Sequence, residues 1–187
     1  LDFQATLETK PEKAIKLEKD ALAQIENITA DNARLVSNLH ANLGGLYRMN
    51  GHPDLAREHM EKSISLLDQF NLLHINDSIP QIANYAMFLT EQQEPERGIS
   101  ELQKLSGIIK EYHSDDCLDY AKVQETLGTI YLMTANLPQA KTHFKRAFKI
   151  YEKIWADEPE MIEAKYQEIQ ELYPQIGFCI GKNLSGL

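Results

Sequence analysis

The chain has 187 residues, of which 43% are hydrophobic and 25% are charged, so it is long enough to bury a core and too apolar for a disordered chain. Its 19 lysines and arginines against 28 aspartates and glutamates leave a formal net charge of -9, which would repel nucleic acid and anionic membranes. No run of about 18 apolar residues is present, so no membrane span is predicted. Nucleic-acid binding and membrane insertion are therefore excluded as first hypotheses.

The first predicted helix covers residues 11–27 and begins at Pro11. Proline suits the first turn of a helix because it has no N–H to donate and its φ is fixed. We expect residues 1–30 to be a partial N-terminal repeat, the second helix of a hairpin whose first helix is absent or degraded. Because the chain starts at Leu1 and not at methionine, we expect it to be a segment of a longer protein or a trimmed product.

A period of 42 residues runs through the chain after this helix. A large apolar, a small and a large apolar residue recur as Leu43, Gly44 and Tyr47, then Tyr85, Ala86 and Leu89, then Leu127, Gly128 and Tyr131. Prolines mark nearly the same spacing, at Pro11, Pro53, Pro95 and Pro138. Apolar residues three and four apart within each half are typical of a helix, so the pattern predicts an all-α chain of antiparallel helix hairpins.

The period also predicts where the repeats lie. The expected segments are full repeats at 37–78, 79–120 and 121–162, a last helix over 159–173, and a C-terminal capping helix and tail over 163–187. Residues 175–187 are expected to fold back over the open apolar edge of the array. The whole chain is thus expected to be a single array.

Small residues occur where two helices of a hairpin would cross. Gly44 and Ala56 are expected to let the two backbones approach closely, because a missing or short side chain leaves room there. Tyr47, Tyr131 and Phe144 are expected to fill the groove between one hairpin and the next, which gives each repeat a core shared with its neighbour.

The spacing resembles that of the tetratricopeptide repeat. The motif L-G-x2-Y occurs at 43–47 and 127–131, and A-x3-F-x2-A occurs at 140–147. The ordinary repeat of that family has about 34 residues, and the longer period is similar to the kinesin-light-chain-like subtype. The resemblance implies an α-α superhelix with three full repeats and partial terminal repeats, acting as a non-catalytic scaffold for protein–protein interaction.

One residue before the repeated large apolar position stand Asn42, Asn84 and Thr126. The first helix of each hairpin lines the concave side of such arrays. The resemblance implies that Asn42 and Asn84 bind a peptide backbone, and Thr126 departs from the pattern. Neighbouring positions on these helices add Asn38, Gly45, Met87 and Lys122 to the candidate peptide-binding residues. The alternative interpretation is that the asparagines are solvated helix residues or form hydrogen bonds between helices.

Residues for catalysis or metal binding form no recognisable motif in the sequence. Two clusters contain metal-ligating residue types: His52 and His59 with Asp54 and Glu58, and His113 with Asp115, Asp116 and Cys117. The first is broken by a proline and favours surface histidines, and the second is typical of a polar turn before a helix. We therefore predict no enzyme activity, no cofactor and no metal site.

Cys117 and Cys179 are far apart and form no CxxC pair, which favours reduced thiols in a cytoplasmic protein. The leading hypothesis is a scaffold that binds a protein or peptide partner in its concave groove. One alternative is a peptide-sensing regulatory domain of a larger signalling protein. Another is self-association through the terminal repeats, where Leu17, Ala21 and Ile25 offer an apolar helix face.

Overall fold

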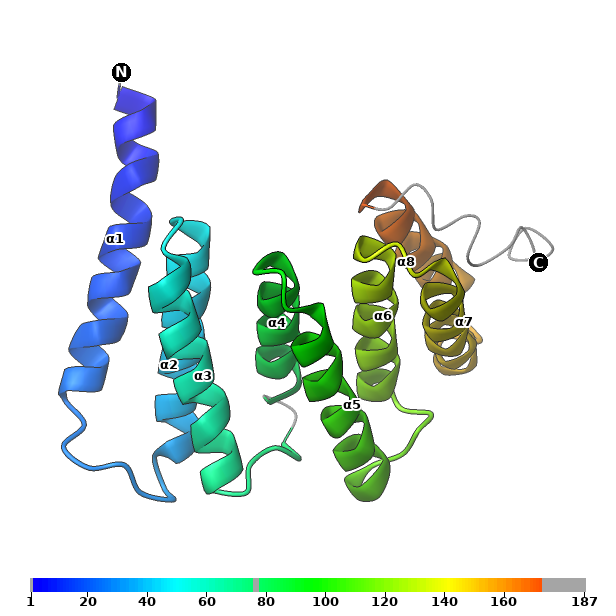
Figure 1. Ribbon diagram of the computed structural model, residues 1–187, viewed down its shortest axis with the longest axis horizontal. Helices are drawn as coiled ribbons and strands as arrows, with labels where there is room; N and C mark the ends of the chain where they lie inside the picture. Colours follow the sequence, from blue (N-terminus) through cyan, green and yellow to red (C-terminus); the bar gives the residue numbers. More distant parts are fainter. Residues whose placement is uncertain (1, 76–77, 173–187) are drawn as a thin grey trace. The chain divides into compact units, whose positions relative to one another are not determined.

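The computed structural model describes the backbone of residues 2–75 and 78–172, and the side chains of residues 11–75 and 78–171. Within these ranges the chain forms eight α-helices and no strand (Figure 1). The helices are α1 (Asp2–Ala23), α2 (Ala33–Met49), α3 (Pro53–Gln69), α4 (Ser78–Glu91), α5 (Pro95–Tyr112), α6 (Leu118–Met133), α7 (Leu137–Ile154) and α8 (Pro159–Leu172). The predicted all-α helical-repeat solenoid is confirmed.

Two compact units divide the chain within α4, one ending at Phe88 and the other beginning at Leu89. In the first unit α2 packs along α3, side by side in Figure 1, and α1 packs against α2. In the second unit α6 packs along α7, α5 packs against α6, and α8 contacts α7. Each unit thus contains one well-packed helix hairpin with further helices against it.

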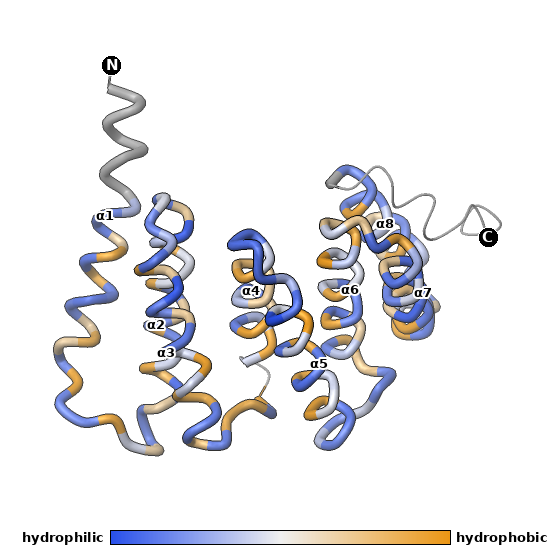
Figure 2. Tube along the Cα trace, in the orientation of Figure 1, coloured by the Kyte–Doolittle hydropathy of each residue, from blue (hydrophilic) through white to orange (hydrophobic). Residues whose placement is uncertain are grey.

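Hydrophilic and hydrophobic residues alternate along the helices in Figure 2, as expected for helices that bury one stripe and expose the other. Among the described residues, no helix combines the length and the apolar character that crossing a bilayer requires.

Three of the four prolines that mark the repeat period lie at helix starts, as predicted. Pro53 and Pro95 are the first residues of α3 and α5, and Pro138 is the second residue of α7. The prediction for Pro11 is wrong, because this residue lies inside α1, which ends at Ala23. One proline removes a single backbone hydrogen bond, and the turns on either side here continue the helix.

The turns after α2, α4 and α6 share one conformation. Gly51, Gln93 and Ala135 have φ of 73°, 65° and 58°, and they are spaced by the repeat period. The next amide N–H donates back to the carbonyl of Tyr47, Leu89 and Tyr131 in turn, at N···O distances of 2.9, 2.8 and 2.7 Å. This pattern is the Schellman motif, in which a left-handed residue ends the helix and turns the chain back.

The expected close approach of α2 and α3 is present. A Cβ added to Gly44 would lie 2.5 Å from Cγ of Met60 and 3.3 Å from the carbonyl oxygen of Ala56. In the other hairpin, a Cβ on Gly128 would lie 3.0 Å from the ring of Phe144. Small residues at these crossings therefore set the distance between the two helices.

The expected place of the aromatic residues needs correction. Phe144 packs on Gly128 inside its own hairpin, and Tyr131 stacks on His143 of that hairpin at a centroid distance of 5.3 Å. Tyr47 does reach the neighbouring helix, since the Lys19 ammonium of α1 lies 5.5 Å from its ring centroid. The position of a residue within the repeat therefore does not predict whether the residue contacts its own hairpin or the neighbouring one.

Helix α8 lies where a last helix was expected and is held by polar contacts as well as by aromatic ones. The Lys165 ammonium lies 3.0 Å from the carboxylate of Glu125 on α6, and both side chains are partly buried, with 19% and 18% exposed. The Tyr151 hydroxyl donates to the same carboxylate at 2.5 Å, and burial beside Glu125 raises the pKa of that tyrosine. The expected cap at 175–187 lies outside the described residues.

Candidate functional site

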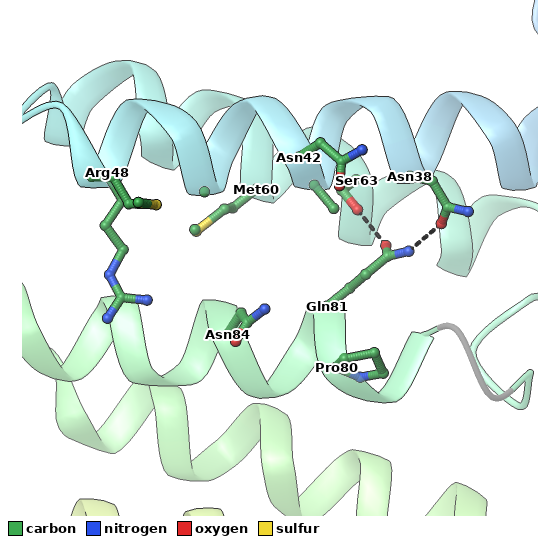
Figure 3. Close-up of a pocket in the computed structure, with 11 residues that line it drawn as sticks. Asn38, Asn42, Arg48, Met60, Ser63, Pro80, Gln81 and Asn84 are labelled. Carbon is green, nitrogen blue, oxygen red and sulfur yellow. Dashed lines mark hydrogen bonds between the residues drawn. The ribbon is translucent and has the colours of Figure 1, made fainter. Parts of the chain in front are cut away.

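A groove of about 560 Å³ lies in the first unit, between residues of α2, α3 and α4 (Figure 3). Its lining residues are Asn38, Ala41, Asn42, Gly45, Arg48, Met49, Met60, Ser63, Pro80, Gln81 and Asn84. Residues of α2 form one wall, because positions three and four apart lie on one face of a helix. The structure thus brings four of the predicted site residues together: Asn38, Asn42, Gly45 and Asn84.

A hydrogen-bonded network crosses one end of the groove. Oε1 of Gln81 accepts from the hydroxyls of Ser63 and Ser37 at 2.6 and 2.8 Å, and Nε2 of Gln81 donates to Oδ1 of Asn38 at 2.5 Å. Figure 3 shows the Gln81 side chain extending from α4 toward Asn38 and Ser63. The two serines are buried, so the network satisfies polar groups that would otherwise be costly to desolvate.

The network also orients the Asn38 amide. Because Oδ1 of Asn38 already accepts from Gln81, its amide nitrogen is the group that remains to donate to a ligand. Asn42, one turn further along α2, donates from Nδ2 to the Glu18 carboxylate of α1 at 3.0 Å. Along the same wall, Asn38 therefore presents its amide nitrogen to a ligand, whereas Asn42 presents its Oδ1.

The other end of the groove is more apolar. Met49 is 84% exposed, and Met60, which also lines the groove, is buried next to Gly44. A Cβ added to Gly45 would meet no atom within 4 Å, so space is open above this residue. Arg48 is the one charged residue that lines the groove, and in Figure 3 its side chain extends from α2 toward α4.

The remaining predicted residues lie elsewhere. Met87, on α4, is half-buried and does not line this groove. Lys122 and Thr126 belong to the second unit, where Lys122 lies 3.9 Å from Asp119 and the Thr126 hydroxyl donates to the Lys122 carbonyl at 2.9 Å. A hydroxyl bonded to its own helix is a poor substitute for a free amide. Peptide binding by these three residues stays a prediction.

Several lining residues were missed by sequence reasoning. Gln81 and Ser63 stand 18 apart in sequence, and their contact depends on how α3 packs against α4 in this unit. Met60 packs under Gly44 in the hairpin core and also lines the groove.

The pairing of Ser63 with Gln81 has a counterpart in the second unit. There Nε2 of Gln124 donates to the Ser106 hydroxyl at 3.4 Å, and these residues are also 18 apart. The second pair follows the first after 43 residues and not 42, so the 42-residue period does not align the two pairs.

A second cavity, of about 490 Å³, lies at the same hairpin and is lined by different residues. These are His40, Glu58, His59, Glu61, Lys62 and Ser65. The Nδ1 atoms of His40 and His59 are 2.9 Å apart, and the His59 ring stacks on Tyr47 at a centroid distance of 5.4 Å. Burial, with the charges of His59 and Lys62, lowers the pKa of His40 to about 4, and burial also lowers the pKa of His59.

Sequence reasoning considered His59 beside His52 and overlooked His40, because the partner lies on the other helix of the hairpin. The Cys117 cluster forms the helix start that was predicted: its Sγ accepts from the Tyr120 N–H at 3.4 Å as the N-cap of α6.

The sequence model of the tetratricopeptide-repeat family matches residues 78–153 of this chain. Repeats of this family are generally scaffolds that bind proteins and carry no catalysis. A search of curated protein sequences finds no match.

Two solved structures share the fold of the chain. BtubC (BKLC) from P. vanneervenii is 19% identical with a TM-score of 0.74, and the match covers 94% of this chain and 72% of that one. A putative kinesin light chain with nearly identical TPR-like repeats from P. anserina is 13% identical with a TM-score of 0.68, covering 80% and 70%. The family match thus identifies tetratricopeptide repeats at residues 78–153, and the two solved structures show that the chain shares the fold of kinesin-light-chain-like arrays.

Proposed function

We propose that this chain is a non-catalytic scaffold that binds an extended peptide segment of a partner protein in the groove of the first unit. The observation that carries the proposal is the position of Asn42 on α2 and Asn84 on α4, which are exposed and line the same groove. A side-chain amide donates and accepts, so it pairs with the backbone of a peptide whatever the side chains are.

The shape of the groove supports a peptide with some apolar side chains. The amides of Asn38 and Gln81 make one end polar, and Met49 and Met60 make the other end apolar. The open space above Gly45 leaves room for a ligand side chain between these ends. Methionine suits such a surface because its flexible thioether adapts to different partners.

The test uses random peptides displayed on phage, selected against the chain and measured by fluorescence anisotropy. The Gly45→Leu variant places a side chain in the groove, where no atom opposes its Cβ, and it is expected to abolish binding of the enriched peptides. Gly107→Leu is the matched control, since Gly107 of α5 is also open to space and does not line the groove. Asn42→Ala and Asn84→Ala should each weaken binding by about 1 kcal/mol, roughly fivefold.

Two results would contradict the proposal. One is the absence of any enriched peptide with the parent chain. The other is equal binding to the parent and to a folded Gly45→Leu variant, which would move the site away from this groove. Circular dichroism of each variant verifies that the helices are retained.

Self-association remains the alternative with a specific observation behind it. Leu17 of α1 is 61% exposed, and Ala21 of α1 and Ile25, just after the end of the helix, are half-buried. In α3 the positions one period after Ala21 and Ile25 are Ser63 and Leu67, which are buried. A second copy covering α1 would give a mass by light scattering that rises with concentration and falls with Leu17→Glu.

A peptide-sensing domain of a larger signalling protein would use the same groove, and its test is the effect of a bound peptide on whatever domain is attached. We place either function in the cytoplasm, because the Cys117 thiol is free and the sequence lacks a disulfide framework.

A further inference from the structure

We propose that His40 and His59 form a binding site for a divalent transition-metal ion such as Zn²⁺, which would link α2 to α3. The cavity beside the two rings shares no residue with the groove, so this site is separate from the proposed peptide site. Imidazole nitrogen is a good ligand for zinc, copper and nickel.

The geometry needs only a small change to hold a metal ion. The two Nδ1 atoms are 2.9 Å apart and share one hydrogen bond, and the ring centroids are 5.1 Å apart. Two nitrogens bound to tetrahedral zinc at about 2.0–2.1 Å lie about 3.4 Å from each other. Binding would open the pair by about 0.5 Å, and the ring that donates from Nδ1 would carry its proton on Nε2 instead, which frees both Nδ1 lone pairs for the ion. Water in the cavity would complete the coordination.

An internal comparison separates this pair from an ordinary packing contact. Two periods later in the chain, Gln124 takes the place of His40, His143 that of His59, and Tyr131 that of Tyr47. Oε1 of Gln124 lies 2.9 Å from Nδ1 of His143, whose ring stacks on Tyr131. A glutamine therefore supplies the same hydrogen bond between the helices, and the hairpin does not require a second histidine for it.

The surroundings of the two pairs differ in charge. Glu58 and Glu61 line the cavity beside the histidine pair, and the equivalent positions two periods later are Thr142 and Lys145. Carboxylates near the ligands favour a cation, and an ammonium group disfavours it. Of the two hairpins compared, the first combines two imidazoles with acidic neighbours and the second does not.

Opposing charges limit the affinity to a modest value. Lys62 lines the cavity, and Lys19 of α1 acts on His59, so two ammonium groups face the two carboxylates. Within the described ranges, no group of three or more histidine, cysteine or acidic side chains has the geometry of a metal site. The ion would therefore have two protein ligands, the imidazole nitrogens of His40 and His59.

The test is a titration of the chain with Zn²⁺ by isothermal calorimetry at about pH 7.5, where histidine is neutral. We expect one ion per chain, and a weakening of at least about tenfold in His40→Gln, because one of two ligands is lost. His40→Gln keeps the hydrogen bond, as Gln124 does, so its thermal unfolding without metal should match that of the parent. His143→Gln is the control and should leave zinc binding unchanged.

Three outcomes would overturn the assignment: no binding to the parent at millimolar Zn²⁺, equal binding to the parent and to His40→Gln, or an equal loss in His143→Gln. None of these depends on peptide binding, so the two proposals fail separately.

Discussion

Adjacent glycines on α2 have opposite roles, which predicts opposite effects of the same substitution. Gly44→Ala would put Cβ 2.5 Å from the Met60 side chain and 3.3 Å from its backbone nitrogen, so we expect a loss of about 1–3 kcal/mol in the free energy of unfolding. Gly45→Ala meets nothing within 4 Å and should gain about 0.5–1 kcal/mol, since alanine costs less backbone entropy in a helix. Urea unfolding of the two variants measures both values.

Gly44→Ala and Gly45→Ala are controls for each other, because both replace glycine by alanine in the same helix. Equal effects of the two would mean that α2 and α3 do not approach closely at Gly44.

The histidine pair predicts a pH dependence of stability. The pKa of His40 falls from 6.5 to about 4 on folding, so its contribution is fully present above pH 6.5 and is lost as the pH drops toward 4. The charges facing the pair are Glu58 and Glu61 with Lys62 on α3, and Lys19 on α1. We expect the parent to lose about 1 kcal/mol more than His40→Gln over this range, a value reduced because the ring is half-exposed.

Unfolding curves at several pH values for the two proteins give this difference. Parallel curves would show that His40 keeps its ordinary pKa in the folded chain.

Four groove residues were predictable and several others were not, for a physical reason. Asn38, Asn42 and Gly45 share one face of α2. Asn84 follows Asn42 after one period, so periodicity alone places it on the equivalent face of the next repeat.

Gln81 and Ser63 meet only because α3 packs against α4 at a particular height. The same spacing recurs at Ser106 and Gln124, which also form a hydrogen bond, but it recurs after 43 residues, so the 42-residue period does not align the two pairs.

At the level of helices and turns, the shared left-handed residue predicts where stability can be gained. Gln93 and Ala135 adopt φ of 65° and 58°, and Gly51 takes the equivalent place with φ of 73°. A residue with a Cβ loses about 1 kcal/mol of conformational free energy in this left-handed conformation, and glycine does not. Gln93→Gly and Ala135→Gly should therefore each raise the free energy of unfolding by about 0.5–1 kcal/mol.

Gly51→Ala should lower the free energy of unfolding by a similar amount. Thermal unfolding of the three variants measures these changes. Destabilisation by Gln93→Gly would show that its side chain contributes more than its backbone costs. Helix starts were predictable from Pro53 and Pro95, whereas the left-handed turns at Gln93 and Ala135 were not, because their residue types do not favour that conformation.

The attachment of α8 is another property of elements. Glu125 accepts from Tyr151 and pairs with Lys165, so Glu125→Ala leaves one buried and one partly buried donor with fewer acceptors. We expect a loss of about 2–3 kcal/mol, more than removal of an exposed ion pair would cost. Hydrogen exchange should then speed up in α8 more than in α2. Tyr151→Phe, which removes one donor and leaves the ion pair, should cost about 1 kcal/mol.

For the whole molecule, the question is whether the two compact units unfold together. Repeat arrays are held by contacts between neighbours, so a local change need not reach the far end. The chain has one tryptophan, and Trp155 stacks on Tyr151 in the second unit at a centroid distance of 4.9 Å. Its fluorescence reports the second unit, whereas circular dichroism reports the helices of both.

Gly44→Ala weakens only the first unit, so it separates the two possibilities. We expect the midpoint of urea unfolding by circular dichroism to fall and to broaden, while the midpoint by Trp155 fluorescence stays close to that of the parent. Ala135→Gly, in the second unit, should move the fluorescence midpoint instead. If Gly44→Ala shifts both probes equally, the units form one cooperative body. A ligand bound in the groove of the first unit would then stabilise α8 as well.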